Sequence, residues 1–314
     1  MFSYAIAFLV ALTAAALLIP PIRLWAVARG LFDQPGGRKV HTQPVPRLGG
    51  IAIAAGFFLG VGVATLIPLG TISATSTRDV PAILAGSAVL VIAGVADDLI
   101  GLSPIVKLLA QVLAAVAAVA LGLSLQVLNL PWGVLDLGVL AWPISVLWIV
   151  AVVNAINLID GLDGLAAGVV LIALVAFFVI APNHASVTLI VGAAAGATLG
   201  FLVYNLHPAS IIMGDAGSML LGFLTASVGI AISSPGSGFT PIYVPIVVLA
   251  LPLGDMLWAV MRRSLGGQSV FEADAGHVHH RLLRGGMNQR EVVVLLHLVA
   301  AAFAGLGVLL GRLA

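Results

Sequence analysis

The sequence contains no cysteine, so neither a disulfide framework nor thiolate chemistry contributes to its fold or function. Charged residues are scarce, at 8% of 314 residues, whereas a soluble domain has about a quarter. The formal net charge of +1 excludes a large polybasic surface, so nucleic acid is not an expected partner. No basic segment precedes the first apolar run, because the first cations are Arg23 and Arg29. This order predicts a retained first span with its N-terminus outside rather than a cleaved signal peptide.

Hydrophobic residues make up 61% of the chain, and they form stretches of helical rather than β-barrel length. Because lipid offers no partners to an open backbone, each span should be helical. We therefore expect an all-α integral membrane protein, one polytopic domain over residues 1–314 with about ten transmembrane helices. The expected spans are 3–25, 49–69, 80–97, 107–124, 139–157, 165–182, 187–204, 217–233, 241–261 and 292–311.

Charges are distributed unequally between the two sides that these spans define. Of the 13 lysines and arginines, only Arg78 and Arg312 fall on the side of the termini. The positive-inside rule makes the other side cytoplasmic and places both termini outside a cell inner (plasma) membrane. Of the 12 acids, only Asp79 and Asp136 lie on the outer side. Such clustering of carboxylates on one face predicts a catalytic or binding face in the cytoplasm.

The first cytoplasmic loop, GGRKVHTQPVPRLGG at 36–50, places Lys39 and His41 among glycine and proline turn residues. A positive-inside anchor is one interpretation. The other is a phosphate-binding loop, because Gly49 and Gly50 at a helix start allow close backbone approach and the helix N-terminus favours an anion.

The second loop, GVADDLIGLSPIVK at 94–107, raises the question of two acids at the end of an apolar run. Asp97 and Asp98 are adjacent, so they point about 100° apart if both are helical and cannot form a tight dyad. One is a candidate to bind a cation or take a proton while the other orients a neighbour. Lys107 begins the next span, and a plain Lys–Asp pair at the membrane surface is the structural alternative.

The third loop, NAINLIDGLDGLAAG at 154–168, repeats an oxygen-bearing side chain every three residues: Asn154, Asn157, Asp160 and Asp163. This spacing predicts a polar strip along one helix face or around a glycine-broken helix end. Hard oxygen ligands at a membrane surface indicate Mg²⁺, which binds one or two carboxylates together with substrate phosphate. A solvated helix end is the alternative.

Two further loops complete the face. In the fourth, Asp215 and Ser218 precede a span, and Asp215 lies between Gly214 and Gly217, as a metal ligand or an ordinary N-cap. The fifth contains DAGHVHHRLLRGG at 274–286, with His277, His279, His280, Arg281 and Arg284. Zinc binding and a merely basic loop are alternatives there, and we favour imidazoles and arginine that hold phosphate oxygens.

Isolated polar residues within the spans have simpler interpretations. Asp255 and Arg262 share a helix face, which predicts a buried ion pair or an orienting contact, with substrate contact as the alternative. His184 and His297 are expected to be structural.

Taken together, these loops resemble the polyprenyl-phosphate N-acetylhexosamine-1-phosphate transferase superfamily (glycosyltransferase family 4). The resemblance covers nearly the whole chain, in the family's order. Its motifs are Asp97-Asp98 with Lys107, Asn154-x-x-Asn157-x-x-Asp160-Gly-x-Asp163-Gly, Gly214-Asp215-x-Gly217-Ser218 and His277-x-His279-His280-Arg281. VPRLGG at 45–50 resembles the GlcNAc-1-phosphate transferase branch, which initiates O-antigen, common antigen or teichoic acid linkage units. Ile212 departs from an aromatic residue that often stacks on uracil in the family.

The resemblance implies transfer of an N-acetylhexosamine 1-phosphate, most simply GlcNAc 1-phosphate, from a UDP-sugar to undecaprenyl phosphate with release of UMP. It implies Mg²⁺, with Mn²⁺ as a substitute, at Asn157 and Asp215. Asp163 would bind uracil, Asp160 would bind ribose or orient the metal site, and Lys107 would hold phosphate. Phosphate binding is further implied for His277, His279, His280 and Arg281. Asp97 is the candidate to deprotonate or position the lipid phosphate, with Asp98 beside it, and direct attack and a covalent aspartyl phosphate both remain open.

Other functions fit the residues less well. The phospho-MurNAc-pentapeptide transferase of peptidoglycan synthesis is the alternative within the superfamily, but that branch usually has PTMGG where this chain has VPRLGG. A cation-coupled transporter would place its acids near the membrane midplane rather than at helix ends. A CDP-alcohol phosphotransferase would need a longer array of four aspartates. Besides the donor, the acceptor and membrane lipid, a homodimer is a further expectation.

Overall fold

The computed structural model describes residues 2–34, 44–66, 79–130, 132–234, 240–267 and 276–313. The polypeptide is almost entirely helical, and the expected all-α polytopic architecture is confirmed. The helices are α1 Phe2–Ala28, α2 Gly49–Leu66, α3 Val80–Ile100, α4 Pro104–Ala120, α5 Ala141–Ile159, α6 Leu165–Ile180, α7 Ala185–Asn205, α8 Gly214–Ser233, α9 Tyr243–Val248, α10 Ala250–Leu265, α11 Val278–Arg284 and α12 Gln289–Leu313, with a short 3₁₀ turn, Gly138–Leu140, before α5.

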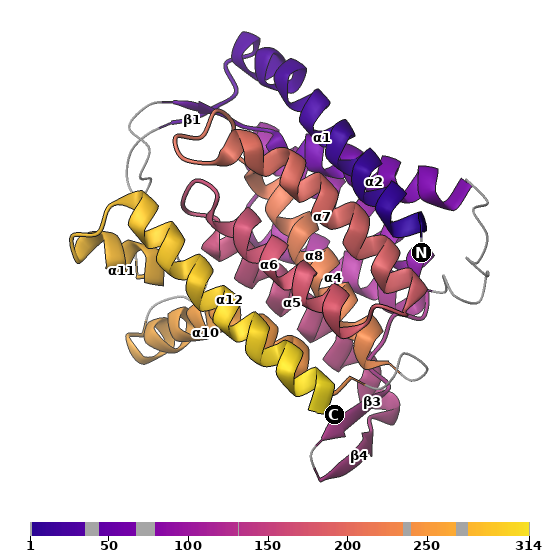
Figure 1. Ribbon diagram of the computed structural model, residues 1–314. Helices are drawn as coiled ribbons and strands as arrows, with labels where there is room; N and C mark the ends of the chain where they lie inside the picture. Colours follow the sequence, from indigo (N-terminus) through magenta and orange to yellow (C-terminus); the bar gives the residue numbers. More distant parts are fainter. Residues whose placement is uncertain are drawn as a thin grey trace.

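Two short antiparallel ribbons interrupt the helices. β1 (Phe32–Asp33) pairs with β2 (Val45–Pro46) near the start of α2, and β3 (Val127–Leu130) pairs with β4 (Gly133–Asp136) between α4 and α5. In Figure 1 the two ribbons lie at opposite ends of the bundle. β1 lies at the end where α11 is found, and the β3–β4 hairpin lies at the end that carries both termini.

Seven helical segments in the described residues are long and apolar enough to cross a membrane: Ser3–Ala28, Gly49–Leu66, Val80–Ile100, Gly138–Ile159, Ala185–Asn205, Gly214–Ser233 and Gln289–Leu313. α4 and α6 are apolar but shorter, at 17 and 16 residues. A multi-pass membrane protein is therefore confirmed, while the number of ten spans and their sidedness stay predictions.

The single helix expected over 241–261 is wrong, because the chain forms α9 and α10 with a break at Leu249. Pro252 explains the break. It has no N–H to donate to the carbonyl of Val248, and its ring would clash with that carbonyl in a continuous helix. After the break, α10 packs against α5 and lies next to α11 in Figure 1.

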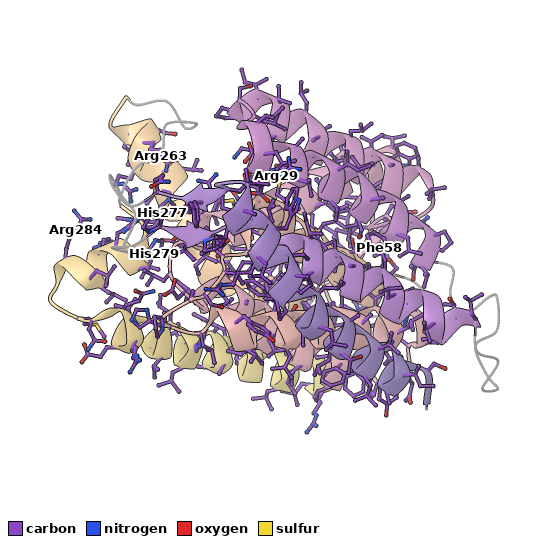
Figure 2. The ribbon with its side chains drawn as sticks, turned by 90° about the horizontal axis from the view of Figure 1, so that it is seen from above. Arg29, Phe58, Arg263, His277, His279 and Arg284 are labelled. Carbon is purple, nitrogen blue, oxygen red and sulfur yellow. The ribbon has the colours of Figure 1, made fainter. Side chains whose placement is uncertain are left out.

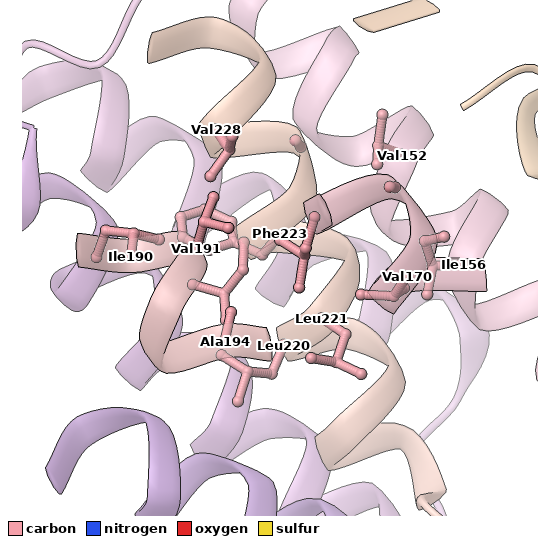
Figure 3. Close-up of a cluster of buried hydrophobic side chains, with 14 of the residues drawn as sticks. Val152, Ile156, Val170, Ile190, Val191, Ala194, Leu220, Leu221, Phe223 and Val228 are labelled. Atoms are coloured by element: carbon pink, nitrogen blue, oxygen red, sulfur yellow. The ribbon is translucent and has the colours of Figure 1, made fainter. Parts of the chain in front are cut away.

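α8 is the centre of the bundle and is buried from Ala216 to Ser233. Its side chains pack against α5, α6 and α7 in the cluster of Figure 3, where Phe223 and Leu221 lie between Val170 and Val191. Because lipid is as apolar as these side chains, close packing rather than water exclusion holds such helices together.

α1 packs closely against α7 because of a stripe of glycines on α7. A Cβ at Gly196 would lie 2.2 Å from the Phe8 carbonyl oxygen, and Gly192 and Gly200 meet α1 in the same way one turn before and after. Small residues spaced four apart allow two helix backbones to touch within a membrane. This contact fixes α7, and with it the start of the loop that leads to α8.

Candidate active site

The polar site forms where four helix ends meet: the end of α3, the start of α4, the end of α5 and the start of α8. Lys107 lies between two carboxylates, with its Nζ 2.6 Å from Asp215 Oδ2 and 3.4 Å from Asp97 Oδ2. The Nδ2 of Asn157 donates to Asp215 Oδ1 at 2.9 Å and to Ser218 Oγ at 2.8 Å. Residues from the second, third and fourth loops thus meet at one carboxylate, that of Asp215.

The turn between α3 and α4 has a local explanation. α3 runs beyond its expected end at residue 97 to Ile100, and Gly101 then adopts a φ of 69°. Asp97 Oδ1 accepts the N–H of Leu102 at 2.7 Å, and Ser103 accepts the N–H of Val106 to cap α4. The Ser-Pro start therefore sets the first turn of α4 so that Lys107 faces back toward Asp97.

Asp98 points to a different partner, as expected from its 100° offset. Its Oδ1 accepts the N–H of Asp215 at 2.9 Å, and its Oδ2 accepts the N–H of Ala216 at 3.1 Å. The carboxylate thus satisfies two amides at the start of α8, where a negative charge is favoured. Gly214 has a φ of 71°, and a Cβ there would lie 2.5 Å from Asp98 Oδ1, so the close approach requires glycine. Asp98 therefore fixes the position of Asp215.

The polar strip of the third loop is divided among several neighbours. Asn154 donates to Oε1 of Gln111 on α4 at 2.6 Å, one turn deeper than the contact between Asn157 and Asp215. Asp160 ends α5, and its burial raises its pKa to about 8, with the charges of Asp215 and Asp98 as further causes. Asp160 therefore holds a proton at neutral pH in the protein without ligands.

Asp163 faces the loop that follows α7. Its Oδ2 lies 2.8 Å from Nδ1 of His207 and accepts the N–H of Ala209 at 3.1 Å. Gly164 follows Asp163 directly, and its N–H donates to Oδ1 of Asn205 at 2.9 Å. The uracil contact expected for Asp163 stays a prediction, and in the structure this carboxylate holds two loops together.

α11 is held by α10. Asp255 accepts from Nδ1 of His277 and from the N–H of Val278, both at 2.8 Å, and these side chains are buried. Arg262, two turns further along α10, donates to the Gly276 carbonyl at 3.0 Å. The orienting contact expected for Asp255 and Arg262 is confirmed, since both grip the segment that leads into α11.

His279 places α11 against the third loop. A Cβ at Gly161 would lie 2.3 Å from its Nε2, so the imidazole packs directly on the Asp160–Gly161 turn. His279 is 1% exposed, and neither ring nitrogen has a hydrogen-bond partner among the described residues. Burial, with the neighbouring imidazole of His280, lowers the pKa of His279 to about 4, so the ring is neutral at pH 7.

The other residues of this motif point in different directions. In Figure 2, His277 and His279 face the body of the bundle and Arg284 points away from it. The His280 ring lies 4.2 Å from that of His279, centroid to centroid, and is tilted from it by 44°. The Arg281 guanidinium lies 6.0 Å from the Trp258 ring centre. No three histidines or acids in the described segments converge as a metal site, which disfavours zinc.

The first loop lies only in part within the described residues: Lys39 and His41 lie outside them. The part that follows is paired with the chain before α8. Ile212 donates to the Pro46 carbonyl at 3.0 Å, and Gly49 and Gly50 donate to the carbonyls of Ile212 and Met213 at 3.0 and 2.8 Å. The amides of both glycines are thus bonded to the chain before α8, and phosphate binding by this loop stays a prediction. The small size of the glycines lets α2 touch α8, because a Cβ at Gly50 would lie 2.2 Å from the Gly217 nitrogen.

Sequence reasoning missed Gln111 and His207. Gln111 lies four residues after Lys107, so it shares a helix face with an assigned residue and is buried in an apolar span. His207 lies between α7 and α8, in the fourth loop, and is followed by Pro208.

The structural roles expected for the isolated histidines are confirmed. His184 accepts the N–H of Val187 at the start of α7, and His297 lies 3.3 Å from the Leu165 carbonyl oxygen.

Magnesium is the cofactor that this donor set can be tested against. Mg²⁺ takes few protein ligands and retains water or phosphate oxygens. Asp215 supplies a carboxylate, and Asn157 beside it carries an amide oxygen, although its NH₂ group is the part that faces Asp215 in the structure. The carboxylate of Asp97 is joined to Asp215 through Lys107. The residues therefore fit Mg²⁺ better than a softer metal.

Comparison with known proteins shows which family the chain belongs to. The model of the family described as glycosyl transferase family 4 matches residues 80–233. The chain is 37% identical to a Bacillus subtilis protein named "Probable undecaprenyl-phosphate N-acetylglucosaminyl 1-phosphate transferase", over 95% of this chain and 82% of that protein. It is 36% identical to the Mycobacterium tuberculosis decaprenyl-phosphate N-acetylglucosaminephosphotransferase, over 88% of this chain and 75% of that protein. An Escherichia coli O157:H7 undecaprenyl-phosphate alpha-N-acetylglucosaminyl 1-phosphate transferase is 32% identical, over 89% and 76%. The chain therefore belongs to glycosyl transferase family 4.

Proposed function

We propose that the protein transfers N-acetylglucosamine 1-phosphate from a UDP-sugar to undecaprenyl phosphate, giving the undecaprenyl-diphospho-sugar and UMP. The product would initiate a cell-surface polysaccharide. The observation that carries the proposal is the ion network of Asp97, Lys107, Asp215 and Asn157 at the joined ends of membrane helices. The names of the relatives support GlcNAc over a MurNAc-pentapeptide as the sugar.

The chemistry requires charge neutralisation more than a strong base. An oxygen of the lipid phosphate attacks the phosphorus that carries the sugar, and the bond from that phosphorus to the bridging oxygen breaks, so that UMP leaves with the electron pair. The acceptor oxygen is already anionic, and the barrier lies in bringing two polyanions together. Lys107 is the cation at this point, and in the absence of substrate the two carboxylates beside it balance its charge.

Asp215 and Asn157 would hold Mg²⁺, or Mn²⁺ in its place, and the bound cation would supply charge stabilisation to the phosphoryl group and the leaving oxygen. Asp97, which faces Lys107, positions the lipid phosphate. Asp98 acts through α8, because both of its oxygens are bound to backbone amides. Asp160, protonated at neutral pH, can donate a hydrogen bond to a ribose hydroxyl or a phosphate oxygen.

His279, His280 and Arg281 would border the nucleotide phosphates from α11. His279 is the best supported of the three, because neither of its ring nitrogens has a partner in the described part of the chain and it packs on the Asp160–Gly161 turn. His277, in contrast, is engaged by Asp255 and serves to hold α11 in place.

We further propose that the site opens to the cytoplasm of a cell inner membrane, and that two copies associate there as a homodimer. The concentration of cations at the site end supports this orientation, because Arg23, Arg29, Arg47, Arg262, Arg263, Arg281, Arg284 and Arg290 belong to loops and helix ends on that side. A transporter is disfavoured, since the acids lie at helix ends rather than in broken helices at midplane depth.

The test is an exchange assay with the purified full chain in detergent. Undecaprenyl phosphate, Mg²⁺ and radiolabelled UDP-GlcNAc are mixed, and label in the lipid phase is followed. We expect transfer that depends on Mg²⁺, is lost in Asp215→Asn and is retained in Asp79→Asn, a matched acid at the far end. Transfer with UDP-GalNAc or UDP-MurNAc-pentapeptide alone would keep the mechanism and change the donor. Absence of transfer with every donor would overturn the proposal.

A further inference from the structure

The end of the bundle opposite the site carries a surface that the transferase reaction does not use. The β3–β4 hairpin projects there from the lower edge of the bundle in Figure 1. All four residues of β4 are exposed, and Trp132, directly before it, is 82% exposed. A two-stranded hairpin is at best marginally stable in water unless something covers it. The nature of that cover can be inferred from the hairpin's own residues.

The ribbon has one apolar and one polar face. Residues directly opposite each other share a face, and the register pairs Leu128 with Leu135 and Asn129 with Val134. One face therefore carries three leucines, Leu128, Leu130 and Leu135, and the other carries Val127, Asn129, Val134 and Asp136.

The leucine face continues the apolar surface of the bundle. At its root, Leu128 packs against the hydrophobic core, and the N–H of Leu125 donates to Ser145 Oγ on α5 at 2.8 Å, which fixes the hairpin to that helix. Leu135, opposite Leu128, is 51% exposed. The same helix exposes Trp142 and Leu147 along a span that faces lipid. The cover that lipid provides for α5 therefore extends onto the hairpin.

The charges of this region also favour lipid over a protein partner. Between Lys107 and Asn154 the sequence contains a single charged residue, Asp136. Its carboxylate lies on the polar face and accepts the N–H of Gly138 at 2.9 Å. A segment without cations, with tryptophans at its margin, matches the boundary between headgroups and acyl chains, where tryptophan is enriched.

The depth of the hairpin follows from its backbone. The outer edges of a two-stranded ribbon present N–H and C=O groups that no third strand pairs. In hydrocarbon such groups are costly, whereas water reaches them at the level of the headgroups. We propose that the hairpin lies flat in the headgroup boundary of the membrane surface opposite the site. Its leucine face points toward the acyl chains and its Asn129–Asp136 face points toward water.

The absence of native cysteine allows a direct test by spin labelling. Leu135→Cys and Val134→Cys place labels on adjacent residues of opposite faces and form a matched pair. The full chain is reconstituted at one copy per lipid nanodisc, and collision of each label with oxygen and with a water-soluble nickel complex is measured. Leu113→Cys on the exposed face of α4 gives the reference for the acyl region.

We expect the label at 135 to favour oxygen over the nickel complex severalfold more than the label at 134, and less than the label at 113. Equal access of the nickel complex to 134 and 135 would overturn the proposal, because the hairpin would then stand in water. Protection of both labels from both reagents would also overturn it, because protein would then cover the ribbon. Tryptophan fluorescence in brominated lipids gives a second measurement without a cysteine, because comparison with Trp132→Phe isolates Trp132 among the five tryptophans. Quenching by bromine near the headgroups that is lost in Trp132→Phe supports the proposal, and equal quenching in the two proteins contradicts it.

Discussion

At one end of the bundle, charged and amide side chains from four helices form one connected network, whereas at the other end the polar contacts of the described residues centre on the start of α7. Lys107 reaches Asp215 through space, and Asp98 reaches the amides of α8. At the far end, His184 caps α7, and Ser186 joins that cap to Asp79 at 3.2 Å. Long-range polar contacts within a membrane are costly to assemble, so their concentration at one end marks the reactive end.

The largest loss of activity is expected when the central cation, Lys107, is removed. Lys107→Met leaves Asp97 and Asp215 without the ammonium between them and removes the cation from the phosphates. We expect kcat to fall by about 10²–10³, the scale of losing one preorganised charge at a transition state. Steady-state label transfer measures it. Lys107→Arg keeps the charge and should recover part of the rate, and wild-type kcat in Lys107→Met would show that the ammonium does not contribute.

Asp98→Asn tests whether the second acid acts by position. The amide keeps one acceptor and turns its NH₂ toward an N–H of α8, so one charge-assisted hydrogen bond, worth about 1.5–3 kcal/mol, is lost. Displacement of Asp215 by a fraction of an ångström should lower kcat about tenfold to a hundredfold. Thermal unfolding and Mg²⁺ titration of activity are the measurements. Asp79→Asn at the far end is the control, and an equal loss in that variant would remove the distinction between the two ends.

The contact between His279 and the third loop can be tested with one methyl group. Gly161→Ala places a Cβ against the imidazole and displaces α11, which should lower kcat/KM about tenfold through the donor's KM. Gly62→Ala, where nothing lies within 4 Å of the new Cβ, should leave both constants unchanged. If both variants behave like wild type, the contact between α11 and the Asp160–Gly161 turn does not contribute to donor binding.

The pH dependence of stability should distinguish Asp160 from His279. The pKa of Asp160 rises from 3.8 to about 8 on folding, so the folded state binds the extra proton and stability falls as pH rises toward 8. The pKa of His279 falls from 6.5 to about 4, so its contribution is lost as pH drops below 6.5. Between pH 6.5 and 8 Asp160 acts and His279 does not, and the contribution of Asp160 is at most about 1.4 kcal/mol per pH unit. The stability of Asp160→Asn, measured by thermal unfolding without divalent cations, should fall less steeply with pH over this range. An unchanged slope would assign the pH dependence to other groups.

The smallest effect is expected at the far end. Ser186→Ala removes the hydroxyl between Asp79 and His184, which should cost about 1 kcal/mol of stability. The kcat of this variant should stay within about twofold of wild type, because nothing at this end contacts the proposed substrates. A large loss of kcat with unchanged thermal stability would show that the two ends are coupled.

Periodicity and charge predicted the helices well, because a membrane allows few other structures. Every expected span overlaps a helix, yet the α9–α10 break was missed, since Pro252 alone does not reveal whether a helix bends or stops. The site's membership was predictable because Asp97, Lys107, Asn157 and Asp215 occur in recognisable motifs. The roles within it were not: only three dimensions show that Asp98 caps α8.

The peptide ladder between Pro46 and Met213 links two motifs that are far apart in sequence. Three backbone hydrogen bonds join 46–50 to 212–213, and the same strand of chain continues directly into Gly214 and Asp215. Because three hydrogen bonds hold the two segments in one register, a displacement of VPRLGG would also displace the start of α8. The position of the Asp215 carboxylate therefore depends on the first loop as well as on its own helix.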